Sequence, residues 1–228
     1  MWYRNVPYHL LTEGIEPEVR AHFDTTLKQL AAKGHRLVEV SLPTSGHALP
    51  VYYVIMPAEA STNLARYDGI RYGRAERGDS LLADYVSSRT EGFGPETIRR
   101  ILLGTFVLSS GYIDAYYRKA DAAREVLTKE YDDAFTTCDV IAFPTTPSPA
   151  FTFGEKTDPV SMYLEDVFTV TANLTGMPAL SVPMGMIERE GKQLPTGIHF
   201  TAPKGAESVL FKIGAATTGE SSTNFGIA

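Results

Sequence analysis

The sequence predicts an α/β fold, because segments with strand patterns and helix patterns alternate along the chain. Residues 35–42 alternate between apolar and polar side chains, as in a half-buried strand. Residues 139–143 form a short apolar run before Pro144, which is typical of a buried strand. Residues 113–135 place apolar side chains every three or four positions, which predicts a long helix.

The first helix is expected to begin at Pro17, since proline suits the first helical position. It is expected to end before Gly34, because glycine tolerates the left-handed conformation that closes a helix. The strand at 35–42 should end at Pro43, and residues 44–48 are predicted to form a loop. The apolar stripe of the helix consists of Val19, Phe23, Leu27, Leu30 and Ala31.

The stretch 51–73 is apolar in its first half and carries paired arginines and tyrosines in its second. We expect a helix from about Leu49, kinked at Pro57 because the proline ring removes a backbone donor. Asp68-Gly69 is predicted to end this helix. Residues 74–90 are rich in charge and are expected to form a mobile connection with a short helix at 81–86.

Pro95 is predicted to start another helix after a turn at 91–95. Arg99 and Arg100 point about 100° apart on such a helix, so one can face solvent while the other faces inward. A further helix is expected to begin at Asp158-Pro159. Two strands are expected at 179–184 and 197–201, where they could be neighbours, with a connecting loop at 188–193. A final helix is expected at 206–216, followed by a frayed tail at 217–228.

Composition excludes several classes of function. The 228 residues carry a formal net charge of −6, so the chain lacks the basic footprint of a protein that grips nucleic acid by itself. No apolar run approaches the roughly 18 residues that span a bilayer, and residues 1–11 do not resemble a signal peptide. The single cysteine, Cys138, is expected to be a buried thiol, which fits a cytoplasmic protein.

No catalytic arrangement is visible in the residues alone. There is no Gly-x-Ser-x-Gly motif, and Ser109-Ser110-Gly111 is better interpreted as a turn. The five histidines show no metal-ligand spacing, and no Gly-rich phosphate loop occurs. Tyr52, Arg100 and Asp166 are candidates for holding a small ligand, since each lies on an otherwise apolar helix near a turn; taken singly, each is more often an ordinary polar residue.

Several motifs, in order, resemble the A subunit of the aspartyl/glutamyl-tRNA amidotransferase, a member of the amidase-signature family. The resemblance covers residues 15–216 and corresponds to the C-terminal part of that subunit only. The motifs are V-Y-Y-V-I-M-P-A-E-A-S-T-N-L-A-R-Y-D-G-I-R-Y-G, E-G-F-G-P-E-T-I-R-R-I-L-L-G-T, S-S-G-Y-I-D-A-Y-Y-R-K-A, A-F-P-T-T-P-S-P-A-F-T-F-G-E-K-T-D-P-V-S-M-Y-L-E-D, T-V-T-A-N-L-T-G-M-P-A-L-S-V-P and L-P-T-G-I-H-F.

The resemblance implies a single, partial amidase-signature domain over residues 1–228, with a mixed β-sheet flanked by helices. Residues 140–143 and 180–183 should lie in the buried part of that sheet, one side of which should be uncovered. In the family, a lysine, a cis-peptide serine and a nucleophilic serine in the N-terminal half perform catalysis. This chain lacks that half, so no catalytic residue is expected in it and the chain alone should be inactive.

The resemblance also implies a glutamine site formed by Tyr52, Arg100 and Asp166. An arginine and an aspartate can pair with the α-carboxylate and α-ammonium of glutamine, while a tyrosine can line the pocket and donate a hydrogen bond. The family's serine attacks the side-chain amide and releases ammonia, which the B subunit uses to amidate Glu-tRNA(Gln) or Asp-tRNA(Asn). The expected partners are the B and C subunits, with tRNA, ATP and magnesium bound mainly by B, and no cofactor in this chain.

Two alternatives stay open. The chain could belong to another amidase-signature hydrolase that acts on simple amides. It could also be a non-catalytic interaction module. The pair Arg100 and Asp166 distinguishes an amidotransferase subunit from a hydrolase of simple amides, because a neutral amide needs no pair of opposite charges.

Overall fold

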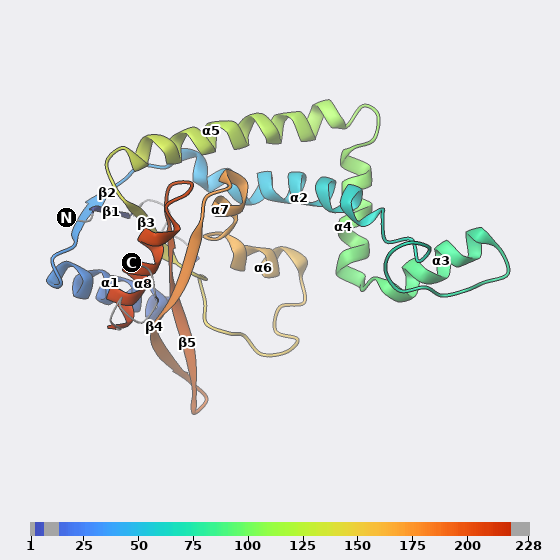
Figure 1. Cartoon of the computed structure of the whole chain (residues 1–228). Helices are drawn as coiled ribbons and strands as arrows, with labels where there is room; N and C mark the ends of the chain where they lie inside the picture. Colours follow the sequence, from blue (N-terminus) through green and yellow to red (C-terminus); the bar gives the residue numbers. More distant parts are fainter. Residues whose placement is uncertain (1–2, 7–13, 220–228) are drawn as a thin grey trace. The chain divides into compact units, whose positions relative to one another are not determined.

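The computed structural model describes residues 3–6 and 14–219 (Figure 1). The chain divides into two compact units. Unit 1 comprises Met1–Leu49 together with Arg124–Ala228, and unit 2 is Pro50–Ala123. Unit 1 is therefore built from both ends of the chain, and unit 2 is one continuous segment.

Among the described residues, unit 1 contains a five-stranded mixed sheet, which confirms the predicted α/β class. β1 is parallel to both β2 and β3, whereas β5 is antiparallel to β3 and to β4. In Figure 1, β4 and β5 are two long neighbouring strands of one hairpin. The strands are β1 (Tyr3–Val6), β2 (Arg36–Glu39), β3 (Val140–Pro144), β4 (Ala179–Arg189) and β5 (Lys192–Thr201), in the spatial order β2-β1-β3-β5-β4.

One face of this sheet packs against α1 (Pro17–Ala32) and α8 (Glu207–Thr218). Gly214 of α8 permits close approach, because a β-carbon there would lie 2.9 Å from Leu180 of β4. Phe200, the register partner of Leu180, is completely buried. This layer is the apolar core of unit 1, since burial of such side chains drives folding.

The opposite face is covered near β3. The rings of Phe143 and Phe168 stack with their centroids 5.7 Å apart, and Phe168 leads into α7 (Val170–Thr175). His199 is the register partner of Phe143 on this face and is buried. Burial lowers the pKa of His199 to about 4.

β4 is an edge strand, and residues 180–183 lie in it as part of the predicted sheet, although only Val182 of these four is buried. All of residues 140–143 are buried, as predicted. In residues 180–183, however, Ser181 and Pro183 are exposed, and Leu180 is only half-buried. Leu180 and Val182 lie on the face that α8 covers, whereas Ser181 and Pro183 lie on the other face of β4, which leaves them exposed.

Most predicted elements of unit 1 are present, with shifted ends. α1 begins at Pro17 and precedes Gly34, which has a positive φ of 87°. The predicted strand at 35–42 is shorter, and the predicted loop after it contains a 3₁₀ helix, η2 (Pro43–His47). The predicted tail is helical up to Thr218, and the rest of that prediction, from residue 220, lies outside the described residues.

The sequence missed β1 and predicted one helix where there are three short ones. The segment after Asp158 forms α6 (Pro159–Tyr163), a 3₁₀ turn η4 (Leu164–Asp166) and α7. Thr169 explains one break, because both its N–H and its hydroxyl donate to the carbonyl of Asp166, at 3.0 and 3.1 Å.

Unit 2 is helical in the described residues. The helix α2 (Ala48–Leu64) ends before the predicted stop at Asp68-Gly69, and Gly69 lies in a later turn. The buried hydroxyl of Ser88 donates to the carbonyl of Glu76 and accepts its N–H, at 3.1 and 2.8 Å, which ties the preceding loop to α3. The elements of unit 2 are α2 (Ala48–Leu64), α3 (Leu81–Gly92), α4 (Pro95–Val107), a π-helical turn η3 (Ile113–Tyr117) and the start of α5 (Arg118–Phe135).

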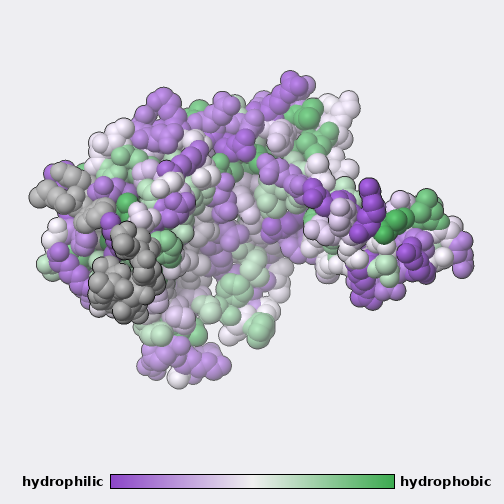
Figure 2. All heavy atoms as spheres, viewed as in Figure 1, coloured by the Kyte–Doolittle hydropathy of each residue, from purple (hydrophilic) through white to green (hydrophobic). Residues whose placement is uncertain are grey.

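α3 is longer than predicted and exposes apolar side chains. Figure 2 shows hydrophobic atoms beside polar ones on the surface over α3. The exposed members are Leu81, Leu82 and Val86, with Leu82 72% exposed. The surface of α3 is therefore partly apolar.

Candidate functional site

Helix α4 separates the two adjacent arginines as predicted. Pro95 occupies the first turn of the helix, which places position 100 in its second turn. The side chain of Arg99 is 47% exposed, whereas that of Arg100 is 29% exposed. Arg100 is therefore the inward member of the pair.

Arg100 is surrounded by groups from α2 and from its own helix. Its Nε donates to Oε1 of Glu96 at 2.8 Å, and its Nη1 lies 3.3 Å from the sulfur of Met56. Its guanidinium carbon lies 6.0 Å from the centroid of the Tyr53 ring, within reach of a cation–π interaction. Partial burial alone would lower the pKa of Arg100, but the hydrogen bond and charge of Glu96, together with Tyr53 and Tyr52, raise it.

The predicted tyrosine, Tyr52, contacts the ring of Tyr53, and Tyr53 lies next to Arg100. Tyr52 and Tyr53 meet edge to face, with centroids 5.2 Å apart and planes at 85°. Both are half-buried, and Tyr53 is the one that faces Arg100. Sequence reasoning missed Tyr53, Met56 and Glu96, although the helical spacing of Glu96 and Arg100 is a signal for a contact.

Asp166 belongs to unit 1, where it is the last residue of η4 and is half-buried. Its neighbour Glu165 forms an ion pair with Lys156 and accepts a 2.9 Å hydrogen bond from Ser148. The side chains of this ion pair are only 18% and 14% exposed. The segment before Asp166 is therefore pinned to the loop that follows β3.

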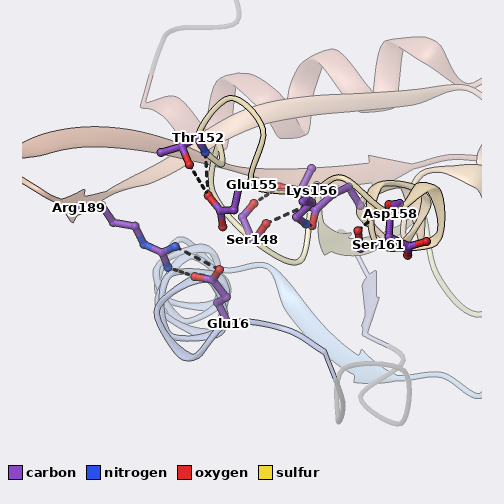
Figure 3. A network of polar contacts seen from close by, with 10 residues as sticks. Glu16, Ser148, Thr152, Glu155, Lys156, Asp158, Ser161 and Arg189 are labelled. Carbon is purple, nitrogen blue, oxygen red and sulfur yellow. Dashed lines mark hydrogen bonds and ion pairs between the residues drawn. The ribbon is translucent and has the colours of Figure 1, made fainter. Parts of the chain in front are cut away.

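Figure 3 shows the polar contacts that shape this loop. Thr152 donates from both its N–H and its hydroxyl to the carboxylate of Glu155, each at 2.9 Å. Asp158 caps α6 by accepting the N–H of Ser161, also at 2.9 Å. Such local caps let a proline-rich segment hold one conformation without a regular strand or helix.

The structure thus describes Tyr52 and Arg100 together in unit 2, and Asp166 within unit 1. What Arg100 offers chemically is a fixed, partly desolvated guanidinium, which suits a carboxylate. What Asp166 offers is a carboxylate on a short 3₁₀ turn, which suits a cation.

Two further predictions, the turn at Ser109-Ser110-Gly111 and the burial of Cys138, agree with the structure. Ser109, Ser110 and Gly111 lie in the turn between α4 and η3, as expected. Cys138 is buried, and its thiol lies 3.3 Å from the carbonyl of Ala134.

In the ranges 3–6 and 14–219, no group of His, Cys, Asp and Glu side chains is arranged to hold a metal ion, and no helix has the length and hydropathy to cross a membrane.

The fold and these motifs are those of the Amidase family. Residues 5–211 match the Amidase family, and the chain belongs to that family. It is 48% identical over 217 residues to the A subunit of the Glutamyl-tRNA(Gln) amidotransferase of Syntrophus aciditrophicus, and 51% identical over 196 residues to the protein of the same name in Chlorobium limicola. These matches cover 94% and 85% of this chain, and they confirm the resemblance noted in the motifs.

A solved structure agrees with this family assignment. The crystal structure of the A subunit of the Thermotoga maritima Glutamyl-tRNA(Gln) amidotransferase is 34% identical and superposes with a TM-score of 0.70 over 94% of this chain. The chain spans 44% and 41% of the length of the two curated relatives and 41% of the solved chain. It therefore corresponds to less than half of each.

Proposed function

We propose that this chain forms the glutamine-binding part of the glutaminase subunit of a tRNA-dependent amidotransferase. In this proposal the complete subunit releases ammonia from glutamine. The ammonia then converts Glu-tRNA(Gln) to Gln-tRNA(Gln), or Asp-tRNA(Asn) to Asn-tRNA(Asn), at a B subunit that binds tRNA, ATP and magnesium. The name that the curated relatives share supports the proposal.

The observation that carries the proposal is the environment of Arg100. A partly buried arginine is held by Glu96 and faces the ring of Tyr53, so its charge is not freely solvated. A guanidinium in such a place favours a ligand with a carboxylate, and free glutamine has one. Asp166 would pair with the α-ammonium group, and Tyr52 would line the pocket.

In this scheme the residues of this chain bind and orient rather than react. Arg100 and Asp166 would hold the amino-acid end of glutamine, leaving the side-chain amide at a distance set by its two methylene groups. The nucleophilic serine and its lysine would come from the part of the subunit that this chain does not include. Fixing the substrate in this way accelerates attack, because the reacting groups no longer search for each other.

The test uses the complete A subunit that contains this chain, purified with its B and C subunits. We expect glutamine-dependent ammonia release, and amidation of Glu-tRNA(Gln) or Asp-tRNA(Asn). Arg100→Ala should strongly reduce glutamine use at substrate concentrations that saturate the wild type. Amidation supported by added ammonium chloride should persist, because ammonia bypasses the glutamine site.

The alternatives predict different results. A general amidase would hydrolyse acetamide or benzamide at least as well as glutamine, and Arg100→Ala would not matter. An interaction module would bind B and C subunits but show no dependence on glutamine. Either result would overturn the proposed function.

A further inference from the structure

Arg99 and Arg100 share one carboxylate in the first turns of α4. Glu96 accepts from Nε of Arg100 through Oε1 at 2.8 Å, and from Nη1 of Arg99 through Oε2. The two pairs are spaced four and three residues apart, the spacings at which helical side chains meet. The side chain of Glu96 is 44% exposed, so the pairs contribute little to stability by themselves.

The contact does decide which edge of the Arg100 guanidinium is available. Glu96 occupies Nε, and the sulfur of Met56, a weak acceptor, lies near Nη1. Among the described residues no hydrogen bond to Nη2 is formed. The end of the fork, Nη1 and Nη2, is therefore the edge that can receive a carboxylate through two parallel hydrogen bonds.

The same contacts limit rotation of the guanidinium. The planar group is fixed at Nε by Glu96, and its carbon is 6.0 Å from the ring of Tyr53. A long arginine side chain otherwise loses considerable rotamer entropy when it binds a ligand. Holding it beforehand removes part of that cost from binding.

We infer that Glu96 is a positioning residue: it fixes Arg100 so that the Nη1–Nη2 edge receives the α-carboxylate of glutamine. This inference rests on the proposed function. Glu96 does not touch the substrate in this arrangement; it acts through Arg100. Its negative charge also opposes the substrate carboxylate, so preorganisation of Arg100 must outweigh that repulsion for the inference to hold.

The experiment measures glutamine kinetics of the complete subunit, purified with its partner subunits, for Glu96→Ala and for the isosteric Glu96→Gln. We expect KM for glutamine to rise about tenfold in Glu96→Ala, which corresponds to about 1.4 kcal/mol. The value of kcat should change less than twofold, because the reacting groups are untouched. Glu96→Gln keeps one acceptor oxygen and should give an intermediate KM.

Two matched variants control for general effects. Arg99→Ala removes another partner of Glu96 and leaves the contact with Arg100. Asp114→Ala removes an ion pair of the same helical spacing, with Arg118 at 2.9 Å, elsewhere in unit 2. Both should leave KM within twofold of wild type, and all four variants should keep ammonium-supported amidation.

Several outcomes would overturn the inference. One is an unchanged or lower KM in both Glu96 variants while Arg100→Ala still destroys glutamine use; the proposed function would then stand without it. Another is an equal loss of kcat and of ammonium-supported activity in both variants, which would mean a structural role. If Arg100→Ala itself leaves glutamine use intact, the proposed function fails as well.

Discussion

Gly104 of α4 lies directly against Pro57 of α2: a β-carbon at position 104 would stand 1.9 Å from the carbonyl oxygen of Pro57 and 2.7 Å from the hydroxyl of Ser61. Arg100 and Tyr53 are each one helical turn before Gly104 and Pro57, respectively. The close crossing of the two helices thus brings the arginine and the ring within contact distance.

Gly104→Ala should destabilise unit 2 even though alanine favours a helix over glycine by about 1 kcal/mol. The clash is with backbone, which cannot move aside as a side-chain end can, so we expect a net loss of about 1–3 kcal/mol in the free energy of unfolding. Denaturant unfolding of the variant measures it. Gly92→Ala, at a helical position with open space, is the control and should be neutral or slightly stabilising.

Arg100→Ala should cost more than Arg99→Ala in kcat/KM for glutamine. We expect about 2–5 kcal/mol for Arg100, the range for removing one partner of a buried charge pair, since Arg99 is the more exposed of the two. Asp166→Asn should act in the same direction with a smaller loss. Steady-state kinetics on the complete enzyme decide this, and a larger effect at Arg99 would shift the assignment by one residue.

Because His199 is buried, we expect the free energy of unfolding to fall in acid. Burial lowers its pKa from 6.5 to about 4, so the unfolded chain binds a proton that the folded chain does not between those values. The stabilising contribution is complete above pH 6.5 and is lost as pH falls toward 4, by about 3 kcal/mol. His199→Gln should flatten the unfolding free energy over this range.

The control for that experiment is His47→Gln, because His47 is exposed. It should retain the pH dependence of the wild type. If both variants, or neither, change the slope between pH 6.5 and 4, burial of His199 is not its cause.

The 228-residue chain alone should release no ammonia from glutamine. Amide hydrolysis needs a nucleophile, a base and donors for the developing oxyanion, and the family resemblance implies that these groups lie largely in segments outside this chain. An ammonia assay on the purified chain measures this. Turnover above buffer that disappears on changing a residue of this chain would show that a nucleophile had been missed.

The isolated chain is also expected to self-associate. Ala179, Ser181 and Pro183 leave one face of the edge strand β4 exposed, and edge strands invite pairing with another chain. Sedimentation velocity should show association that grows with concentration and weakens in Ala179→Lys. Ala75→Lys, at an exposed loop position of unit 2, should not weaken it, and a monodisperse wild-type monomer would contradict the prediction.

The sequence predicted best the features that depend on local rules. Pro17 and Gly34 bound α1 because of backbone preferences that need no partner. Helix geometry predicts that one of the adjacent arginines can face inward while the other faces solvent, and the choice of Arg100 as the inward one came from the family resemblance. The buried strand β3 is recognisable in the sequence because it is a short, continuous apolar run, and all five of its residues are buried.

What the sequence did not predict depends on contacts between distant segments. β1 has four residues and gains its partners from residues 36–39 and 140–141, which no local pattern reveals. Tyr53 rather than Tyr52 faces Arg100 because of the helix crossing at Gly104. The roles of Tyr52, Arg100 and Asp166 toward glutamine came from family resemblance and remain predictions.

The division of the chain has a consequence for the order in which it folds during synthesis. Unit 2 is continuous from Pro50 to Ala123, so all of its contacts become available before the second part of unit 1 has been made. β1 and β2 can pair early, but β3 joins them only after residue 144 has emerged, and β5 joins β3 after residue 201. Closing such long loops slows folding. Unit 1 is therefore expected to complete its sheet last, after unit 2 has folded.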